Sequence, residues 1–421
     1  MRHQLEHHFR EQQRFAEGYS PLYAHLFAIV ADWLAADAAD PVVGWLIEAA
    51  AERPPFDVTL LLMAALHRDV LAGEPAAAEL GRYYTTAEVT PVARPPTNDH
   101  RPPSEKAPPL AAVSGLPSAV ILRATILARR DALGEFIRTA NVQTNETGRG
   151  LVWLLPVACM GWDAVHLVEL GASAGLNLVA DRRVYRLADA AEPSRTQLQL
   201  GAGAPPQFTT LVRGGAARPP TAEATPVART PPEVATPLAA VVGRRSAVDL
   251  PTILSRTGGD VRPFQLRDAE DELTLASYIW GDQAQRMARL CEGIAALRSV
   301  ERSAAPVHLA PLNLPDELPR FLTNELPRPL DAPVVIYNTV VTLYLPDRGA
   351  SLRGMVAEWA ARQSVPVLWL QWEPSRDGPP PPEREWMAWT ADYWPNDGRP
   401  ARCSRLAWVH PHGTALEWVE G

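Results

Sequence analysis

The segment "HLVELGASAGLNL", residues 166–178, decides the fold because it joins a short apolar run to a glycine-rich turn. The run "VHLVEL", 165–170, has the continuous apolar character of a strand buried in a parallel sheet. The turn admits two interpretations. Gly171–Gly175 matches G-x-S-x-G, the turn that presents the nucleophilic serine of a hydrolase, here Ser173. From Glu169 onward, the same residues give E-x-G-x-x-x-G, a strand that enters a glycine turn around a nucleotide-like cofactor.

Downstream of this turn, strand-like and helix-like patterns alternate, which implies a parallel sheet with right-handed crossovers. One long helix is expected at 270–297. Further strands are expected at 258–260, 306–312, 332–345 and 365–373, with an antiparallel pair at 384–394 and 404–420. The predicted fold class is therefore α/β, a Rossmann-like, mainly parallel sheet with a C-terminal antiparallel hairpin, preceded by a helical N-terminal domain.

Two domains are predicted. Residues 1–160 form a helical cap domain, in which Ser20 is a plausible N-cap and residues 91–116 form a proline-rich loop. His67 lies on one of these helices, where a satisfied core histidine is the expected role. Residues 161–421 form the α/β domain, interrupted at about 182–250 by an inserted small sheet and loop.

The composition excludes several classes of function. The net charge of −8 and the pI of about 5.7 disfavour nucleic acid and anionic membranes as partners. Lys106 is the only lysine and sits in a proline-rich stretch without a glycine loop. Classical P-loop chemistry and lysine Schiff bases are therefore excluded.

The three cysteines are far apart and include no C-x-x-C pair, so neither a metal site nor a disulfide framework is predicted. The polar N-terminus is no signal peptide, and no apolar run approaches the ~20 residues that span a bilayer. A cytoplasmic protein that acts on a small molecule is expected, and its oligomeric state is left open.

The hydrolase interpretation of Ser173 finds little support in its surroundings. A nucleophile elbow normally follows several strands, and its oxyanion hole uses a loop on an earlier strand. Almost everything before residue 165 has helix or linker patterns, and no H-G-G loop precedes the serine. His410 and His412 lie downstream, so the chain order serine, acid, histidine is still available.

The cofactor interpretation fits better. Gly171 and Gly175 allow tight turning and close approach to a ligand, and a following helix would offer its free N–H groups. Asp260, at the end of the second strand, is the candidate for binding ribose hydroxyls. The dinucleotide pattern G-x-G-x-x-G is absent, because Ser173 takes the second glycine position and Asn177 breaks the spacing. A nucleoside-like ligand smaller than NAD is therefore favoured.

A polar run, "RTANVQTNETGRG" at 138–150, precedes the apolar segment before the first strand. Its residue types suit a loop with helix caps, which the spacing alone slightly favours. The alternative is a polar pocket lining formed by Arg138, Gln143, Asn145 and Glu146. Asn338 has two comparable interpretations, as a pocket residue at the end of the fourth strand or as a buried polar residue bonded to backbone.

The stretch Glu169–Gly175 resembles the first motif of class I S-adenosylmethionine-dependent methyltransferases, over roughly residues 161–421 without the insertion. Their parallel sheet also ends in an antiparallel hairpin. The resemblance implies that Asp260 binds the ribose. It places Gly171, Ser173 and Gly175 around the methionine part of the cofactor. Glu169 and Asn177 are also expected to bind the cofactor.

On the methyltransferase hypothesis, the expected catalytic residues are Asn145, Glu146 and Asn338, and Arg138 and Gln143 are expected to bind the substrate. Glu146 would act as a base where the acceptor requires one. The chain departs from the amino-group methyltransferases at one point. Asn338 is followed by Thr339 rather than by Pro-Pro-Tyr, which puts methylation of an amide or nucleobase nitrogen in doubt.

The whole chain resembles an uncharacterised bacterial family, domain-of-unknown-function family 2332. The stretches that carry this resemblance are "SPLY", "RTANVQTNETGR", "VELGASAGLNL", "GGDVRPFQL", "YIWGDQAQRMARL" and "VLWLQWEP". The sequence leaves three hypotheses: a methyltransferase for a small molecule, a binding or regulatory protein on the same fold, and a serine hydrolase.

Overall fold

The computed structural model describes residues 1–36, 39–88, 115–143, 145–203, 208–213, 249–375 and 380–419. The chain divides into two compact units. The first comprises Met1–Thr144 with Leu266–Cys291, and the second comprises Asn145–Gln265 with Glu292–Gly421. The predicted boundary lay after residue 160, whereas this division falls at residue 144. Most of the predicted proline-rich loop, and residues 214–248 of the predicted insertion, lie outside the described residues.

The first unit is helical. Its α-helices are α1 Arg2–Ala16, α2 Pro21–Ala36, α3 Pro41–Ala49, α4 Pro55–Ala72, α5 Ala78–Gly81, α6 Ala119–Thr139 and α9 Ala269–Ser277, with 3₁₀ turns η1 Pro75–Ala77 and η2 Thr85–Glu88. The predicted N-cap is confirmed, since the Ser20 hydroxyl accepts a hydrogen bond from the Tyr23 N–H at 3.2 Å. His67 is fully buried between the Ser277 carbonyl and the Thr86 hydroxyl, as expected of a core histidine.

The helix predicted over 270–297 is wrong as a single element, because it breaks between α9 and α10, Ala284–Val300. The break places Asp282 at the start of α2. There its carboxylate accepts hydrogen bonds from the Ser20 hydroxyl at 2.6 Å and the Leu22 N–H at 3.2 Å. Trp280 stacks on the Tyr23 ring, with centroids 4.9 Å apart. These contacts stabilise an irregular segment that the helical pattern of the sequence conceals.

The described residues of the second unit form an eleven-stranded sheet of order β3-β2-β4-β11-β10-β9-β8-β7-β1-β5-β6. The strands are β1 Ala164–Leu170, β2 Tyr185–Asp189, β3 Thr196–Leu200, β4 Phe208–Arg213, β5 Thr252–Asp260, β6 Val307–Pro311, β7 Val334–Thr339, β8 Val367–Glu373, β9 Met387–Trp394, β10 Arg402–Val409 and β11 Ala415–Trp418. Strands β6, β5, β1, β7 and β8 are all parallel. The predicted antiparallel pair at the C-terminus is confirmed as β9 and β10.

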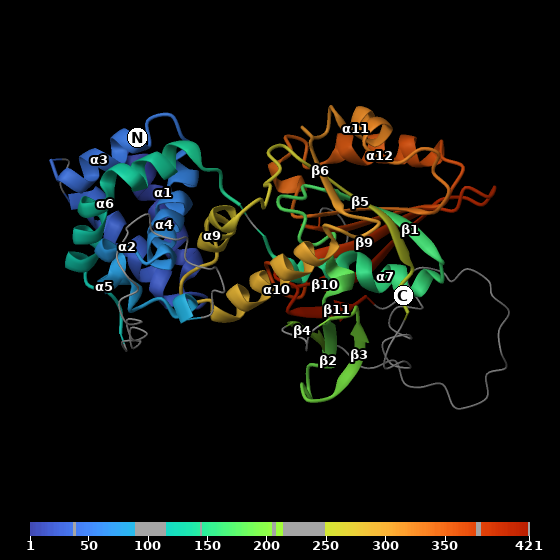
Figure 1. The fold of residues 1–421 in the computed structure, drawn as a ribbon, viewed down its shortest axis with the longest axis horizontal. Helices are drawn as coiled ribbons and strands as arrows, with labels where there is room; N and C mark the ends of the chain where they lie inside the picture. The colour runs from blue at the N-terminus through green and yellow to red at the C-terminus, as the bar shows by residue number, and fades with distance from the viewer. Residues whose placement is uncertain are drawn as a thin grey trace. The chain divides into compact units, whose positions relative to one another are not determined.

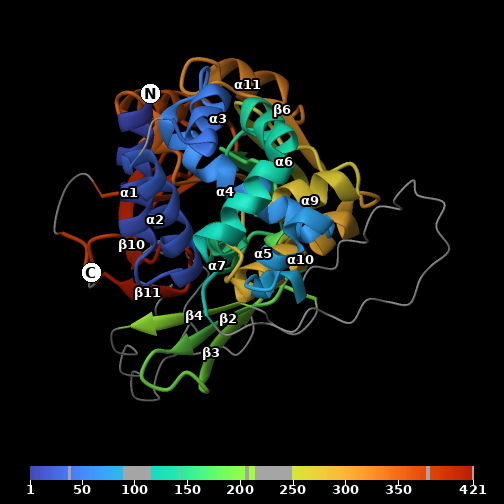
Figure 2. The ribbon, with the colours of Figure 1, turned by 90° about the vertical axis from the view of Figure 1, so that its left-hand side faces the viewer.

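The inserted strands do not form the separate small sheet that was predicted. Strand β11 pairs in parallel with β4, and β4 pairs with β2, so β2, β3 and β4 extend the main sheet. Figure 2 shows this extension in green at one end of the sheet. The sequence could not reveal it, because the β4–β11 pairing joins segments about 200 residues apart.

Helices cover both faces of the parallel part of the sheet (Figure 1). The buried residues of α7, Leu151–Met160, pack against one face of β1, β7 and β8. Helices α11, Leu318–Asn324, and α12, Ala350–Ala361, pack against the other face. The unit is thus mixed α/β with a mostly parallel sheet. Among the described residues, no helix combines the length and apolar character needed to cross a bilayer.

The α-helix expected directly after the glycine turn is absent from the described residues 171–182, which contain turns and the 3₁₀ segment η4, Ala180–Arg182. Gly175 has a left-handed backbone, with φ of 71°, which interrupts helical geometry. The buried Arg256 of β5 then donates to the Leu178 carbonyl and to both Asp181 oxygens, the latter at 2.7 Å. These bonds hold the chain against the sheet, so the predicted helix N-terminus is wrong.

Candidate functional site

The glycine turn follows β1 at the carboxyl end of the parallel strands. Gly171 has φ of 80°, and Ser173 has φ of 48°, a left-handed value that is uncommon for a residue with a side chain. The N–H groups of Gly171 and Ala172 donate to the Gly259 carbonyl at 2.8 and 3.0 Å. The turn is therefore fixed to the neighbouring strand β5.

Asp260 ends β5, as predicted, and contacts the turn directly. Its Oδ2 accepts a hydrogen bond from the Ser173 N–H at 2.8 Å, and its Oδ1 accepts one from the Arg262 N–H at 3.0 Å. Asp260 is half-buried. The structure thus brings together the acidic end of the second strand and the glycine turn after the first.

Glu169 lies beneath the turn with only 2% of its surface exposed. It pairs in register with Tyr337 of β7, and both side chains point to the sheet face that α7 covers. Burial raises the pKa of Glu169 to about 8, against the opposing effect of Tyr337 and Asn177. Its Oε1 accepts from the Asn177 amide at 3.5 Å. Its buried Oε2 has no partner within hydrogen-bond distance in the described part of the chain, and the Tyr337 hydroxyl is the neighbouring group that acts on this carboxyl.

The polar run before α7 divides between two roles. Asn145 reaches the turn, since its Oδ1 accepts from the Ala174 N–H at 3.4 Å, and its buried Nδ2 has no partner among described residues. Glu146 caps the 3₁₀ segment η3, Thr147–Gly150, by accepting from the Gly148 N–H at 3.3 Å. Its other oxygen lies 3.0 Å from His412 Nδ1. One residue of the run therefore borders the turn, and the next acts as a helix cap.

Asn338, proposed as a catalytic residue, is fully buried. Its amide donates to Glu373 Oε1 at 2.6 Å, and its carbonyl accepts from the Trp369 indole at 2.7 Å. Asn338 is therefore an interior polar residue, bonded here to side chains rather than to backbone.

Glu373, at the end of β8, is the centre of this network. It also accepts from the Val341 N–H at 2.9 Å, and from the Thr342 N–H and hydroxyl at 3.1 and 2.7 Å. Burial raises the pKa of Glu373, and these hydrogen bonds oppose the rise. The loop that Glu373 holds begins at Val340, whose φ of 61° is a true outlier for a β-branched residue.

This loop after β7 contacts the turn after β1. A Cβ atom placed on Gly171 would lie 2.4 Å from Cγ2 of Val341, which is far closer than real contacts allow. The glycine therefore makes room for the Val341 side chain. Any ligand that approaches Gly171 from this side has to displace that side chain.

A family model described as an uncharacterised protein conserved in bacteria, domain-of-unknown-function family 2332, matches residues 6–101 and 111–418. The chain belongs to this family. No curated protein and no solved structure matches it.

In this member of family 2332, three of the stretches that carry the resemblance meet at one place. The polar run supplies Asn145, the glycine turn supplies Ala174 and Ser173, and the "GGDVRPFQL" stretch supplies Asp260. The two histidines of the hydrolase hypothesis lie between β10 and β11. Burial lowers the pKa of His410 to about 4, and its Nδ1 contacts the His412 N–H and the Thr414 hydroxyl.

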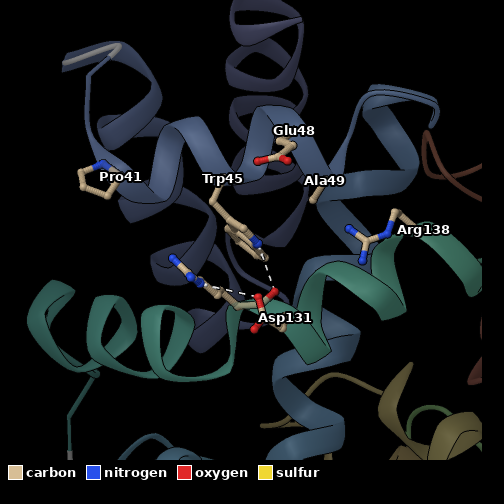
Figure 3. A pocket seen from close by; sticks show the side chains of 7 residues that line it. Pro41, Trp45, Glu48, Ala49, Asp131 and Arg138 are labelled. Carbon is tan, nitrogen blue, oxygen red and sulfur yellow. Dashed lines mark hydrogen bonds and ion pairs between the residues drawn. The ribbon is translucent and has the colours of Figure 1, made fainter.

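The predicted substrate-binding residues Arg138 and Gln143 belong to the first unit of this family member. Arg138 pairs with Glu135 at 3.1 Å and borders an open hollow of about 600 Å³ (Figure 3). The hollow is lined by Pro41, Trp45, Glu48, Ala49, Arg130, Asp131 and Arg138. In Figure 3 the Trp45 indole reaches from α3 to α6, where it donates to the Arg130 carbonyl at 3.0 Å. This charged surface offers no enclosed pocket for catalysis.

Sequence reasoning missed three residues of the site in this protein: Tyr337, Val341 and Glu373. Glu373 ends the predicted strand 365–373, so the rule that selected Asp260 could also have selected it. Tyr337 is next to Asn338, and successive side chains of a strand point to opposite faces of the sheet. This alternation could have placed Tyr337 on the face opposite to Asn338. No local signal identifies Val341, because its role depends on Gly171.

Proposed function

We propose that the site around Glu169, Gly171 and Asp260 binds S-adenosylmethionine and that this protein methylates a small molecule. The observation that carries the proposal is the hydrogen bond from the Ser173 N–H to Asp260. It joins the acidic end of β5 to the glycine turn, at the carboxyl ends of parallel strands. The strand order reverses at β1, with β5 on one side and β7 on the other, and such switch points bind nucleotide-like ligands in open α/β sheets.

The polar atoms around the turn match the chemical groups of the proposed cofactor. Glu169 Oε2 and Asn177 Oδ1 are acceptors for an ammonium group, and Asn145 Nδ2 is a donor for a carboxylate. Each of these atoms is buried without a partner among the described residues, which is costly unless a ligand or water completes it. Asp260 keeps acceptor capacity for ribose hydroxyls, since each carboxylate oxygen can accept more than one hydrogen bond.

When bound, S-adenosylmethionine supplies an electrophilic methyl group. The tasks of this chain are then to orient the acceptor and to exclude water. The buried network of Asn338 and Glu373 fixes the loop after β7 beside the turn. Glu146 is the proposed base for acceptors that must lose a proton, although its cap and its contact with His412 have to be released first.

The proposal is tested by calorimetric titration of the full chain with S-adenosylmethionine and S-adenosylhomocysteine. Asp260→Asn should weaken binding at least tenfold. Asp397→Asn is the matched control. Like Asp260, Asp397 accepts a hydrogen bond from the backbone N–H two residues later in the chain, here Arg399 at 3.1 Å, but Asp397 lies on an exposed turn. Absence of binding to either ligand, or equal binding by both variants, overturns the proposal.

A second candidate is a binding or regulatory protein that holds a nucleoside-type ligand without turnover. The hydrogen bonds of Glu146 and Asn338 favour it, because they already engage two of the proposed catalytic side chains. Cofactor binding without methyl transfer to any of a broad panel of small-molecule acceptors would support this alternative. For the third hypothesis, a serine hydrolase, labelling of Ser173 by a fluorophosphonate probe is the decisive result.

A further inference from the structure

Helix α1 has two distinct faces. Leu5, Phe9, Gln12 and Ala16 are buried at three-to-four-residue spacing and face the core of the first unit. The other positions of the first ten residues, "RHQLEHHFRE" at 2–11 without Leu5 and Phe9, are rich in histidine and glutamate. Three of these side chains converge at one point: His7, His8 and Glu11.

Glu11 lies between the two imidazoles. Its Oε1 is 3.4 Å from His7 Nε2, and its Oε2 is 2.8 Å from His8 Nδ1. One ligand atom from each of the three residues lies within 4.8 Å of the others. The His8 ring also packs edge-on against Phe56, with centroids 6.0 Å apart, and this contact restricts its orientation.

We propose that His7, His8 and Glu11 form a surface site for a divalent transition-metal ion of the zinc class. Imidazole nitrogens and carboxylate oxygens bind zinc at about 2.0–2.2 Å, so two tetrahedral ligands are about 3.3 Å apart. The His7–Glu11 distance of 3.4 Å matches this spacing. The hydrogen-bonded His8–Glu11 pair, at 2.8 Å, has to open by only about 0.5 Å to reach it.

The side chains are accessible to an ion from solvent, since their exposed fractions are 64% for His7, 29% for His8 and 43% for Glu11. Three protein ligands leave the fourth tetrahedral position to water. His3 is outside the cluster. Its side chain is 83% exposed and lies 3.7 Å from Glu6, so it provides a matched histidine control on the same helix.

The experiment is a calorimetric titration of the full chain with Zn²⁺ at pH 7.5 in a non-chelating buffer. A Cys403→Ser background removes the exposed thiol as a competing ligand. We expect one ion per chain with micromolar affinity. Glu11→Gln and His8→Ala should each weaken binding at least tenfold, whereas His3→Ala should change it less than twofold.

Two results would overturn the proposal. One is the absence of saturable zinc binding by the background protein. The other is a loss in His3→Ala as large as that in His8→Ala, because it would assign the ion to the i, i+4 pair of His3 and His7. Circular dichroism of each variant checks that α1 remains folded, and His8→Gln replaces His8→Ala if it does not. The test is independent of the proposed methyl transfer.

Discussion

The loops after β1 and β7 are each anchored by a carboxylate, but the two carboxylates differ in burial and in the hydrogen bonds they accept. Each follows a buried parallel strand and contains a left-handed residue other than glycine, Ser173 in one and Val340 in the other. Each is held by a carboxylate that ends the adjacent strand, Asp260 or Glu373. The buried Glu373 receives four hydrogen bonds from side chains and loop backbone, whereas the half-buried Asp260 receives two from backbone alone.

The difference indicates which loop is built for structure and which retains capacity for a ligand. In the loop after β7 each oxygen of the Glu373 carboxylate accepts two hydrogen bonds, so this loop is held rigidly. The turn after β1 has buried polar atoms of Glu169 and Asn145 without partners among the described residues. Because such atoms are costly, a ligand or water that completes them is strongly favoured.

The largest expected effect is that of Glu373→Ala. The substitution removes the acceptor of four hydrogen bonds and leaves the donors of Asn338, Val341 and Thr342 buried. We expect the free energy of unfolding to fall by about 4 kcal/mol, measured by urea denaturation. Glu383→Ala is the control, since that carboxylate is about half exposed, and it should cost far less than Glu373→Ala. Equal costs would contradict the role of Glu373 as the clamp of this loop.

Gly171→Ala tests the contact between the two loops. Its Cβ would lie 2.4 Å from Val341 Cγ2, and the residue has φ of 80°, so overpacking and backbone strain together should cost about 3 kcal/mol. Gly161→Ala is the matched control, because Gly161 has φ of 65° but nothing within 4 Å of its Cβ position.

Gly161→Ala should therefore lower the free energy of unfolding by only about 1 kcal/mol, because it introduces backbone strain without a steric clash. Adding Val341→Ala to Gly171→Ala should recover the steric part of the loss. If Gly171→Ala lowers the free energy of unfolding no more than Gly161→Ala, the Val341 side chain is free to move away from the new methyl group. The loop after β7 would then be mobile rather than rigid.

Local sequence patterns could predict the parts of the fold that depend on neighbouring residues. Continuous apolar character predicted β1, and the strand-end rule selected Asp260, because buried parallel strands meet at one edge of the sheet. The Ser20 cap was also predictable, since capping involves residues only three apart.

Most of the failures involve partners distant in sequence. The glycine turn is not followed by a helix because Arg256 binds Asp181, 75 residues away. The helix at 270–297 breaks where Asp282 caps a helix that starts 260 residues earlier. The clamp at Glu373 holds a loop more than 30 residues before it. Periodicity reports which face of an element is buried, and it contains no information about such pairs.

A smaller effect is expected from Glu169→Gln, and it depends on pH. The folded pKa of about 8 exceeds the usual 4.5 of a free glutamate. Between these values the unfolded chain loses the proton first, so the wild-type free energy of unfolding falls as pH rises and levels off above about 8. The amide variant lacks this dependence. Its advantage over wild type should grow by about 2 kcal/mol from pH 6 to pH 8, measured by urea denaturation at each pH.

A constant difference between the two proteins would mean that water or a partner group already compensates the buried Glu169 carboxylate. The stability of Glu169→Gln also sharpens the ligand test. A variant that folds as well as wild type but no longer binds S-adenosylmethionine would assign the loss to the Glu169 carboxyl group rather than to damage in the turn.

The smallest expected effect on stability is that of Asp260→Asn. The amide keeps one acceptor oxygen, so either the Ser173 N–H or the Arg262 N–H retains its bond, and half-exposure lets water reach the other. We expect a cost of about 1 kcal/mol in urea denaturation, against about 4 for Glu373→Ala. A cost near that of Glu373→Ala would make both carboxylates structural clamps. The turn after β1 would then have no more capacity for a ligand than the loop after β7, and the proposed cofactor site would lose its physical basis.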